Sequence, residues 1–273
     1  MKKKVAVILS VYYSDHLEHL KCAINSIMLQ THNEVYLFIY RDGIVSAATD
    51  EYLHCIKSKH EKITLIVSEN NLGLAHALNT LIDLVISKGS FSYIARMDSD
   101  DISRPERLQR QVHFFEKNVD IDVCGTSCRE FGASFALKDK HLPKTHEQLI
   151  DFSIGRCPFI HPSVMFRAKV FNSGVRYPKN TALTEDMALW FILLNKGFRF
   201  SNLNEILIDY RLNEDTVSRR AGWGKAWSEF SIRFSNMLTL NRISINNIIL
   251  VFARLVFHLL PISLLKIAYR KFR

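Results

Sequence analysis

Residues 91–101 read Phe-Ser-Tyr-Ile-Ala-Arg-Met-Asp-Ser-Asp-Asp, an apolar run that ends in three carboxylates within four positions, Asp98, Asp100 and Asp101. Carboxylates this close repel one another and raise each other's pKa unless a cation or strong hydrogen-bond donors compensate. Hard divalent cations such as Mn²⁺ and Mg²⁺ prefer oxygen ligands of this kind. The stretch therefore predicts a buried strand whose acidic end lies at the edge of an active site that holds Mn²⁺ or Mg²⁺.

Strand and helix patterns alternate around this run. The predicted elements are strands at 4–11, 35–40, 63–67 and 91–97, and helices at about 17–27, 48–59 and 74–86. Such alternation predicts an α/β fold with a mostly parallel, Rossmann-like central sheet flanked by helices. Ligands bind such sheets at the carboxyl ends of the strands. Asp42, the turn at 70–73 and the acidic cluster all follow strands, so we expect them to converge on one pocket.

Two helix starts carry capping signals. Asp15 is predicted to cap the first helix. Ser103-Arg-Pro-Glu106 reads as a capping box with proline in the first turn of a helix that carries Leu108 and Val112 on its apolar face.

After Val119 the elements become shorter and mixed. Predicted here are strands at 123–131 and near 205–210, a mixed segment at 159–167, and a helix from about Thr184 to Asn195. This second half is expected to extend the sheet of the first. Glu185 and Asp186 open the predicted helix, where acids are favourable with the helix dipole, so the residues alone leave capping and catalysis both open, with capping the commoner role.

The composition limits the class of protein. With 273 residues and 48% hydrophobic content the chain can form a substantial core. Its five scattered cysteines fit reduced thiols, and Cys124 and Cys128 are expected in the core rather than on zinc. The first apolar run is too short for a secretion signal and is predicted to be a strand.

The whole net charge of +9 lies in residues 216–273, which hold ten basic residues and one acid. Apolar runs such as 248–252 and 255–257 interrupt the basic residues, which favours an anionic lipid surface over nucleic acid. Because Arg254, His258 and Pro261 break the apolar pattern, amphipathic helices lying in the membrane interface are predicted, with a tilted or re-entrant insertion second. A core helical hairpin with a solvated basic rim is the remaining alternative.

Several segments together resemble the inverting family 2 glycosyltransferases, which have the GT-A fold and use nucleotide-sugars. The segments that carry the resemblance are Val5 to Tyr12, Arg41-Asp42-Gly43, Asn71-Leu-Gly73 through Asn79, Asp98-Ser-Asp100-Asp101, Thr184-Glu-Asp186 with Leu189-Trp190, and Tyr210-Arg211 with Ser218. Bacterial enzymes that build O-antigen, capsule or exopolysaccharide are the most similar in type. The resemblance implies a GT-A domain over residues 1–220, with a nucleotide-sugar half (1–119) and an acceptor half (120–220), followed by the basic membrane-associating tail at 221–273.

The resemblance also implies roles for individual residues. Asp42 would accept from the base, with UDP-sugar as the donor, and Asp98 would hold the ribose. Asp100 would ligate Mn²⁺ or Mg²⁺ at the diphosphate. Asp186 would be the general base for an acceptor hydroxyl, and the single displacement would invert the anomeric carbon. Asp101 would either support the site or cap the following loop.

For several other residues the sequence allows either a role in the site or a structural role. The resemblance places Asn71, Gly73, Asn79 and Arg96 in the donor site, whereas Arg96 could equally be a structural ion-pair partner. Glu185, His161, Trp190 and Arg211 are weaker candidates for acceptor or phosphate contacts; a histidine beside proline and a tryptophan among leucines are more often structural. The family often has a metal-binding His after the Tyr-Arg pair, but this chain has Asn213.

The implied partners are a nucleotide-sugar, a saccharide linked to undecaprenyl diphosphate, and a membrane surface, with no nucleic acid. The implied location is the cytoplasmic face of the inner (plasma) membrane, peripheral or monotopic. A phosphotransferase of the haloacid dehalogenase type is an alternative, although its aspartates would follow a strand near the N-terminus. A membrane-bound module that binds nucleotide-sugars without catalysis is another. An EF-hand is excluded because the sixth position of the loop is Ser103 instead of glycine.

Overall fold

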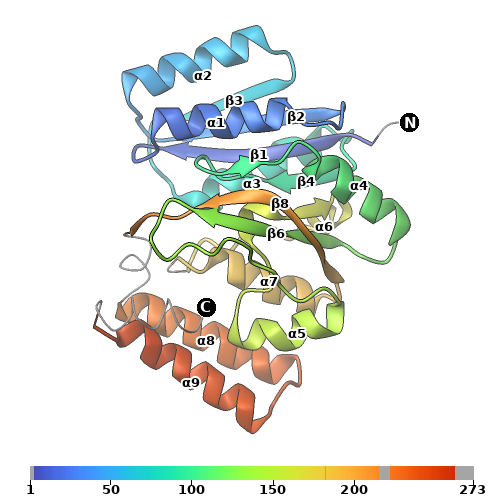
Figure 1. Cartoon of the computed structure of the whole chain (residues 1–273), viewed down its shortest axis with the longest axis vertical. Coiled ribbons are helices and arrows are strands. Elements are labelled where there is room, and N and C mark those ends of the chain that lie inside the picture. Colours follow the sequence, from blue (N-terminus) through green and yellow to red (C-terminus); the bar gives the residue numbers. More distant parts are fainter. Residues whose placement is uncertain (1–2, 182, 215–221, 262–273) are drawn as a thin grey trace.

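The computed structural model describes residues 3–181, 183–214 and 222–261. A single eight-stranded sheet passes through this part of the chain, and helices lie on both of its faces (Figure 1). The strands are β1 (Val5–Tyr12), β2 (Val35–Asp42), β3 (Ile63–Ser68), β4 (Tyr93–Arg96), β5 (Ile102–Ser103), β6 (Val123–Phe131), β7 (Met165–Arg167) and β8 (Phe200–Arg211). The helices are α1 (Leu17–Met28), α2 (Ala47–Lys59), α3 (Leu74–Ser87), α4 (Arg107–Lys117), α5 (His146–Gly155), the 3₁₀ turn η1 (His161–Ser163), α6 (Lys169–Asn172), α7 (Glu185–Asn195), α8 (Trp223–Thr239) and α9 (Ile245–Leu259).

The order of the strands is β3-β2-β1-β4-β7-β6-β8-β5. β1, β2, β3 and β4 are parallel, β7 is antiparallel to both β4 and β6, and β8 is parallel to β6. The predicted α/β fold with a mostly parallel sheet is therefore confirmed, and the second half does extend the sheet of the first.

The apolar run of β1 is continuous because both faces of the sheet are covered. Ala6 and Ile8 pack into the core on the α3 and α7 side, whereas Val7 and Leu9 pack into the core on the α1 and α4 side. Since side chains alternate along a strand, a strand buried on both faces needs apolar residues at every position.

The chain changes direction across the sheet at β1. It builds β2 and β3 on one side of β1 and then places β4 on the other side. A crevice forms where strand order reverses, outside the carboxyl ends of β1 and β4, and ligands bind there in open α/β sheets. The segment Tyr12–Asp15 and the cluster Asp98–Asp101 both lie at this position.

Both predicted caps are wrong. α1 begins after His16, and the Asp15 carboxylate instead accepts a hydrogen bond of 2.9 Å from the main-chain N–H of Tyr12. Ser103 belongs to β5, where it pairs with Ile208 of β8, and α4 begins only after Glu106. For Ser103, a strand partner distant in the sequence thus overrode the local capping pattern.

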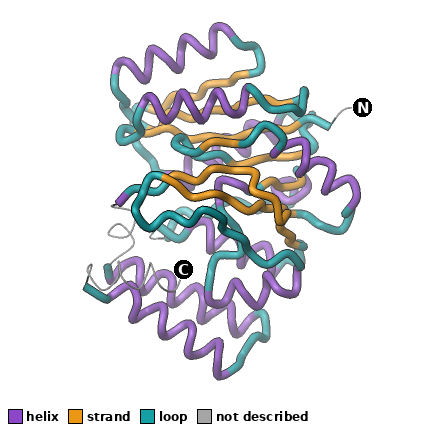
Figure 2. Tube along the Cα trace, in the orientation of Figure 1, coloured by secondary structure: helices purple, strands orange, loops and turns teal. Residues whose placement is uncertain are grey.

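The C-terminal hairpin, which we define as α8 and α9, packs against α5 and α7 (Figures 1 and 2). Met237 and Val251 insert into the core on the α7 side of the sheet. The outer face of the hairpin exposes large apolar side chains. These include Trp223, Trp227, Phe234, Leu238, Ile245, Ile249, Phe252 and Val256. Among the described residues, no helix is both long enough and apolar enough to cross a membrane.

Candidate functional site

Asp42, at the end of β2, organises the loop that starts α3. Its Oδ1 accepts a hydrogen bond of 2.7 Å from the main-chain N–H of Leu72, and its Oδ2 accepts one of 2.9 Å from that of Gly73. Gly43 has φ +85°, and a Cβ there would lie 2.9 Å from the main-chain nitrogen of Asn71. A glycine is therefore needed for the close approach. The structure brings Asp42, Asn71 and Gly73 together beside Tyr12, the partner of Asp42 on β1.

Arg96, the last residue of β4, is almost fully buried and forms an ion pair with Asp98. Its guanidinium also donates to the carbonyl oxygen of Met97. These contacts fix the start of the acidic cluster, so the geometry favours the ion-pair alternative for Arg96 over a direct phosphate contact. Asp98 remains partly exposed at the crevice.

Asp100 shares a small cavity with the loop that follows β1. The cavity measures about 90 Å³ and is lined by Tyr12, Ser14, Asp15, His16, His19, Asp100 and Asn213. Burial, together with the negative charges of Asp98 and Asp15, raises the pKa of Asp100 to about 7. Burial also raises the pKa of Asp15 to about 6, although hydrogen bonds to Tyr12 and Ser99 oppose this. Two crowded carboxyl groups of this kind mark a place where a cation would be stabilised.

Asp15 was missed as a site residue because its position before an apolar helical stripe indicated a cap. The reversal of strand order at β1 would have identified it. That rule places the segment after β1 in the same crevice as the segment after β4.

Asp101 and Arg211 join the acidic cluster to the end of β8. Asp101 is fully buried and accepts a hydrogen bond of 2.7 Å from the main-chain N–H of Arg211. The Arg211 side chain donates to the carbonyl oxygen of Asp100 at 2.8 Å and lies 4.4 Å over the ring of Phe131. Burial and the adjacent Asp98 and Asp100 hold the pKa of Asp101 well above its usual range. Arg211 thus positions the acidic loop.

The acids at the start of α7 lie on the other side of the site. Burial and the adjacent Asp186 raise the pKa of Glu185. The buried hydroxyl of Tyr177 experiences the charges of Arg96, Asp186, Asp98 and Glu185. Charged groups at the end of β4 and at the start of α7 thus both act on Tyr177.

His161 supports this arrangement from η1. Its Nε2 lies 2.9 Å from the Tyr177 hydroxyl, and burial with the nearby Arg96 keeps its pKa well below the usual range. A neutral, hydrogen-bonded imidazole at this place favours the structural alternative for His161.

Two predicted contacts lie outside the site. Trp190 is fully buried among Phe159, Phe166 and Phe200, so no acceptor sugar can stack on its ring, and of its two alternatives the structural one is correct. The side-chain amide of Asn79 uses its nitrogen and its oxygen to bind the main chain of Tyr177, each at 2.8 Å. Asn79 thus fixes the position of Tyr177, and the geometry favours this role over a donor contact.

The donor atoms of the crevice fit a hard divalent cation only in part. Asp100 and Asp98 can supply oxygen ligands. The negative charge of Asp98 raises the pKa of Asp100, and the positive charge of Arg211 opposes this effect. Within the described residues, no three His, Cys, Asp or Glu side chains are grouped closely enough to hold a metal alone. Mg²⁺ characteristically takes one or two carboxylates and completes its shell with phosphate oxygens and water. The residues present suit a cation that binds together with a diphosphate.

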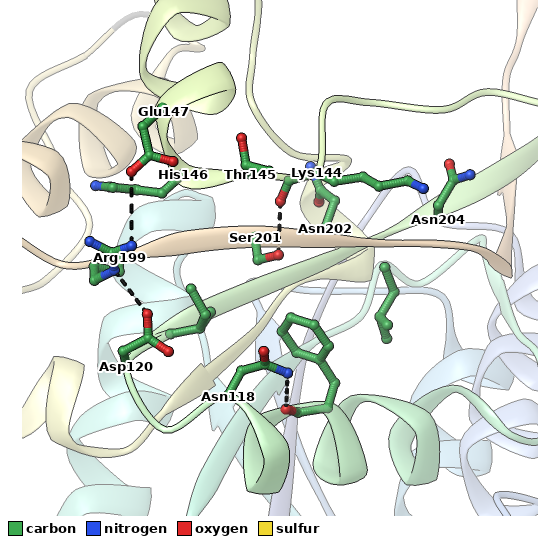
Figure 3. Close-up of a pocket in the computed structure, with 13 residues that line it drawn as sticks. Asn118, Asp120, Lys144, Thr145, His146, Glu147, Arg199, Ser201, Asn202 and Asn204 are labelled. Atoms are coloured by element: carbon green, nitrogen blue, oxygen red, sulfur yellow. Dashed lines mark hydrogen bonds and ion pairs between the residues drawn. The ribbon is translucent and has the colours of Figure 1, made fainter.

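A larger cavity of about 490 Å³ lies at the opposite edge of the sheet, where β6 and β8 begin (Figure 3). Its polar groups largely satisfy one another. Arg199 lies 3.1 Å from Asp120 and 3.9 Å from Glu147, and Ser201 donates to the carbonyl oxygen of Lys144 at 2.8 Å (Figure 3). This cavity is remote from the acidic crevice, so we do not assign the donor to it.

The sequence of residues 6–174 matches the profile of the family described as "Glycosyl transferase family 2". Over 98% of its length the chain is 27% identical to the amylovoran biosynthesis glycosyltransferase AmsE of Erwinia amylovora, of which it covers 98%. It is 30% identical, again over 98% of its length, to UDP-Gal:alpha-D-GlcNAc-diphosphoundecaprenol beta-1,3-galactosyltransferase of Escherichia coli, of which it covers 96%.

Solved structures share the fold. The chain superimposes on S. aureus TarS in complex with UDP-GlcNAc with a TM-score of 0.65 and 15% identity, over 93% of this chain and 72% of that one. The mannosyltransferase PcManGT of Pyrobaculum calidifontis, in complex with GDP-Man and Mn²⁺, gives a TM-score of 0.61 at 12% identity, over 99% of this chain and 85% of the other. At such identities the likeness concerns the fold alone, and it agrees with the predicted GT-A architecture.

Proposed function

Since this chain belongs to glycosyl transferase family 2 and is therefore a glycosyltransferase, we propose that it moves a sugar from a UDP-sugar to a hydroxyl of a lipid-linked saccharide, with inversion at the anomeric carbon. The alternatives of a dehalogenase-type phosphotransferase and of a non-catalytic module do not agree with this family. The observation that supports the proposal is the acidic cluster Asp98–Asp101, which follows β4 and whose Asp100 shares a small cavity with the loop after β1.

The donor half supplies binding and orientation. In the proposal the base lies beside Asp42 and the loop 71–73, and the ribose lies near Asp98. The rigid hydrogen bonds of Asp42 to Leu72 and Gly73 keep this loop in place before the donor arrives. Such preorganisation lowers the entropy lost on binding.

The diphosphate then lies between β1 and β4, next to Asp100. A Mn²⁺ or Mg²⁺ ion held by Asp100, diphosphate oxygens and water would neutralise the charge that develops on the leaving nucleoside diphosphate. Arg211 holds the main chain of Asp100 in position. The raised pKa of Asp100 supports this assignment, because a cation would offset both the burial and the repulsion from Asp98 and Asp15 that raise it.

Asp186 acts as the general base. It takes the proton of the acceptor hydroxyl while that oxygen forms a bond to the anomeric carbon from the face opposite the diphosphate. The bond from the anomeric carbon to the phosphate oxygen breaks, and the diphosphate leaves with the electron pair. One in-line displacement of this kind inverts the configuration.

The acceptor is proposed to be a saccharide on undecaprenyl diphosphate at the cytoplasmic face of the plasma membrane. The exposed tryptophans Trp223 and Trp227 of the hairpin, with side chains 71% and 61% exposed, support contact with a bilayer. The positive charge of residues 216–273 would add attraction to anionic lipid.

A donor screen tests the reaction. UDP-, GDP- and dTDP-sugars are incubated with the protein, Mn²⁺ and a lipid-linked acceptor, and the products are read by mass spectrometry and by NMR at the anomeric carbon. We expect a UDP-sugar to be transferred with inversion. Transfer from another nucleotide-sugar alone would reject the UDP assignment, and a retained configuration would reject the single displacement.

Vesicle flotation tests the membrane contact. The full chain is expected to float with vesicles that contain phosphatidylglycerol and to bind weakly to pure phosphatidylcholine. Trp227→Glu should lose flotation. Val119→Glu, an exposed apolar residue after α4, serves as the control and should float like the parent. Equal flotation of both variants would reject the hairpin as the membrane-binding surface.

A further inference from the structure

Thr184, the residue at the N-terminus of α7, uses its side chain in an unusual way. A threonine in this position normally accepts a hydrogen bond from an N–H of its own helix. Here the side chain makes no such bond, and its hydroxyl lies 2.8 Å from the hydroxyl of Ser228 on α8. Thr184 is 2% exposed, so this bond is shielded from water. A local cap has been replaced by a tertiary contact with the C-terminal hairpin.

The residue before Thr184 is held by the same helix. Leu183 has φ +55°, a left-handed conformation that a branched side chain adopts only under constraint. Its carbonyl oxygen accepts a hydrogen bond of 3.2 Å from the Lys225 side chain. Lys225 and Ser228 are three residues apart on a helix and so face the same direction. α8 therefore contacts two consecutive residues immediately before Glu185 and Asp186.

A buried ionic cluster fixes α8 in turn. Glu229 accepts hydrogen bonds of 2.8 Å from both Arg233 of α8 and His258 of α9, and Arg254 lies 3.5 Å away. Burial disfavours the charge of Glu229, but these cationic neighbours outweigh it and hold its pKa below the usual range. Removing one partner of such a buried cluster is strongly destabilising.

Arg233 extends the cluster to α5. It donates to the carbonyl oxygens of Ser153 and Ile154 at 2.6 and 3.1 Å. α8 also packs directly against α7. The hairpin is thus a fixed support next to the start of α7.

We propose that Ser228 and Lys225 are positioning residues that hold the start of α7, so that Glu185 and Asp186 face the acceptor in the correct geometry. The C-terminal hairpin is then part of the catalytic structure and not only a membrane anchor. The functional part of this inference rests on the proposed role of Asp186 as general base. A displacement of a catalytic group by about 1 Å can lower a rate by as much as roughly 100-fold.

The test compares Ser228→Ala with Ser231→Ala in the full chain. Ser231 is exposed on the same helix, and the hydrogen bonds from α8 to residues 183 and 184 come from Lys225 and Ser228, so Ser231 is the matched control. Ser228→Thr keeps a hydroxyl and should rescue. Two quantities are measured: hydrogen exchange of the amides of residues 183–187, and kcat and KM on a soluble saccharide acceptor.

We expect Ser228→Ala to accelerate exchange at 183–187 by roughly 3- to 10-fold, the effect of one lost hydrogen bond. kcat should fall by roughly tenfold while the affinity for the nucleotide-sugar, measured by calorimetry, stays constant. Lys225→Met should give the same pattern through Leu183. Ser231→Ala and Ser228→Thr should match the parent.

Exchange at 183–187 that is unchanged in both Ser228→Ala and Lys225→Met would overturn the proposal. Faster exchange with an unchanged kcat would overturn it as well, because the position of the loop would then not matter for transfer. If the parent chain transfers no sugar, the proposed function fails, while the exchange measurement still decides whether α8 holds the start of α7.

Discussion

Asp101 accepts a hydrogen bond of 2.7 Å from the main-chain N–H of Arg211, and this bond joins the loop after β4 to the end of β8, which lies 110 residues later in the chain. Its second carboxylate oxygen is buried and has no hydrogen-bond partner among the described residues. A fully buried carboxyl group with one acceptor bond has a raised pKa and is costly when charged. The bond to Arg211 thus fixes the position of the acidic cluster, although burial disfavours the charged form of Asp101.

Replacing Asp101 with alanine should destabilise the protein by about 1–3 kcal/mol, because the buried N–H of Arg211 loses its acceptor. Asp101→Asn keeps an oxygen in that place and should be closer to the parent in urea denaturation. Equal free energies of unfolding for Asp101→Ala and the parent would show that this bond does not hold the loop.

Asp186→Asn should lower kcat by roughly 100- to 10,000-fold, since the acceptor hydroxyl loses its base. Binding of the nucleotide-sugar, measured by calorimetry, should persist, because the proposed donor site is formed by Asp42, Asp98 and Asp100 and does not include Asp186. Glu185→Gln is the control at the adjacent position and should retain more activity. Loss of donor binding in Asp186→Asn would count against the assignment of the base.

Asp100→Asn should weaken metal-dependent binding of the donor. Donor affinity is measured by titration in the presence and absence of Mn²⁺. We expect Mn²⁺ to increase the donor affinity of the parent and to have no such effect on Asp100→Asn. Asp101→Asn is the matched neighbour and should keep that increase. If Asp100→Asn leaves the Mn²⁺ dependence intact, Asp100 is not the ligand.

The metal-free protein should become less stable as the pH rises from about 4 to about 7. The folded chain raises the pKa of Asp100 to about 7 and that of Asp15 to about 6, both from 3.8. Because the folded state then binds more protons than the unfolded state, the free energy of unfolding falls over this interval.

Thermal melting with a chelator at pH 5 and pH 8 measures this effect. The double variant Asp15→Asn, Asp100→Asn should flatten the pH dependence, and excess Mg²⁺ should raise the melting temperature of the parent at pH 8 by at least roughly 2 °C. An identical pH dependence in the parent and the double variant would contradict the assignment of these two groups.

Trp190→Phe should lower stability without changing the KM for the acceptor. The indole is fully buried against aromatic rings, and the smaller ring leaves a void that typically costs about 1–3 kcal/mol. Urea denaturation and acceptor kinetics check the two statements separately. If Trp190→Phe raised the acceptor KM without changing stability, Trp190 would have to contact the acceptor.

Hydrophobic patterns within short segments of the sequence predicted most of the strands and helices. The strand Val123–Phe131 agrees at both bounds, and the acidic end of β4 lies at the expected crevice. β8 begins at Phe200, well before the predicted start at 205, because pairing with β6 continues through the polar Asn202. No local pattern reveals such pairing.

Contacts between distant residues also limited the prediction of the site. Asp42 and Gly73 could be placed together from the ends of strands, whereas the partner of Thr184 lies 44 residues away on α8 and leaves no local signal. Asp15 looked like a cap because its real neighbours, Ser99 and Asp98, are brought to it only by the order of the strands. Capping residues next to a crevice are thus the least reliable assignments from sequence.

The short strand β7 pairs with β4 on one side and with β6 on the other, both in antiparallel fashion. The strands of the first half of the chain and those of the second half therefore share one network of main-chain hydrogen bonds. A rotation of one half of the enzyme against the other would break that network at β7. Any change in the width of the crevice would then have to come from the loops that follow the strands, because the sheet itself moves as one body.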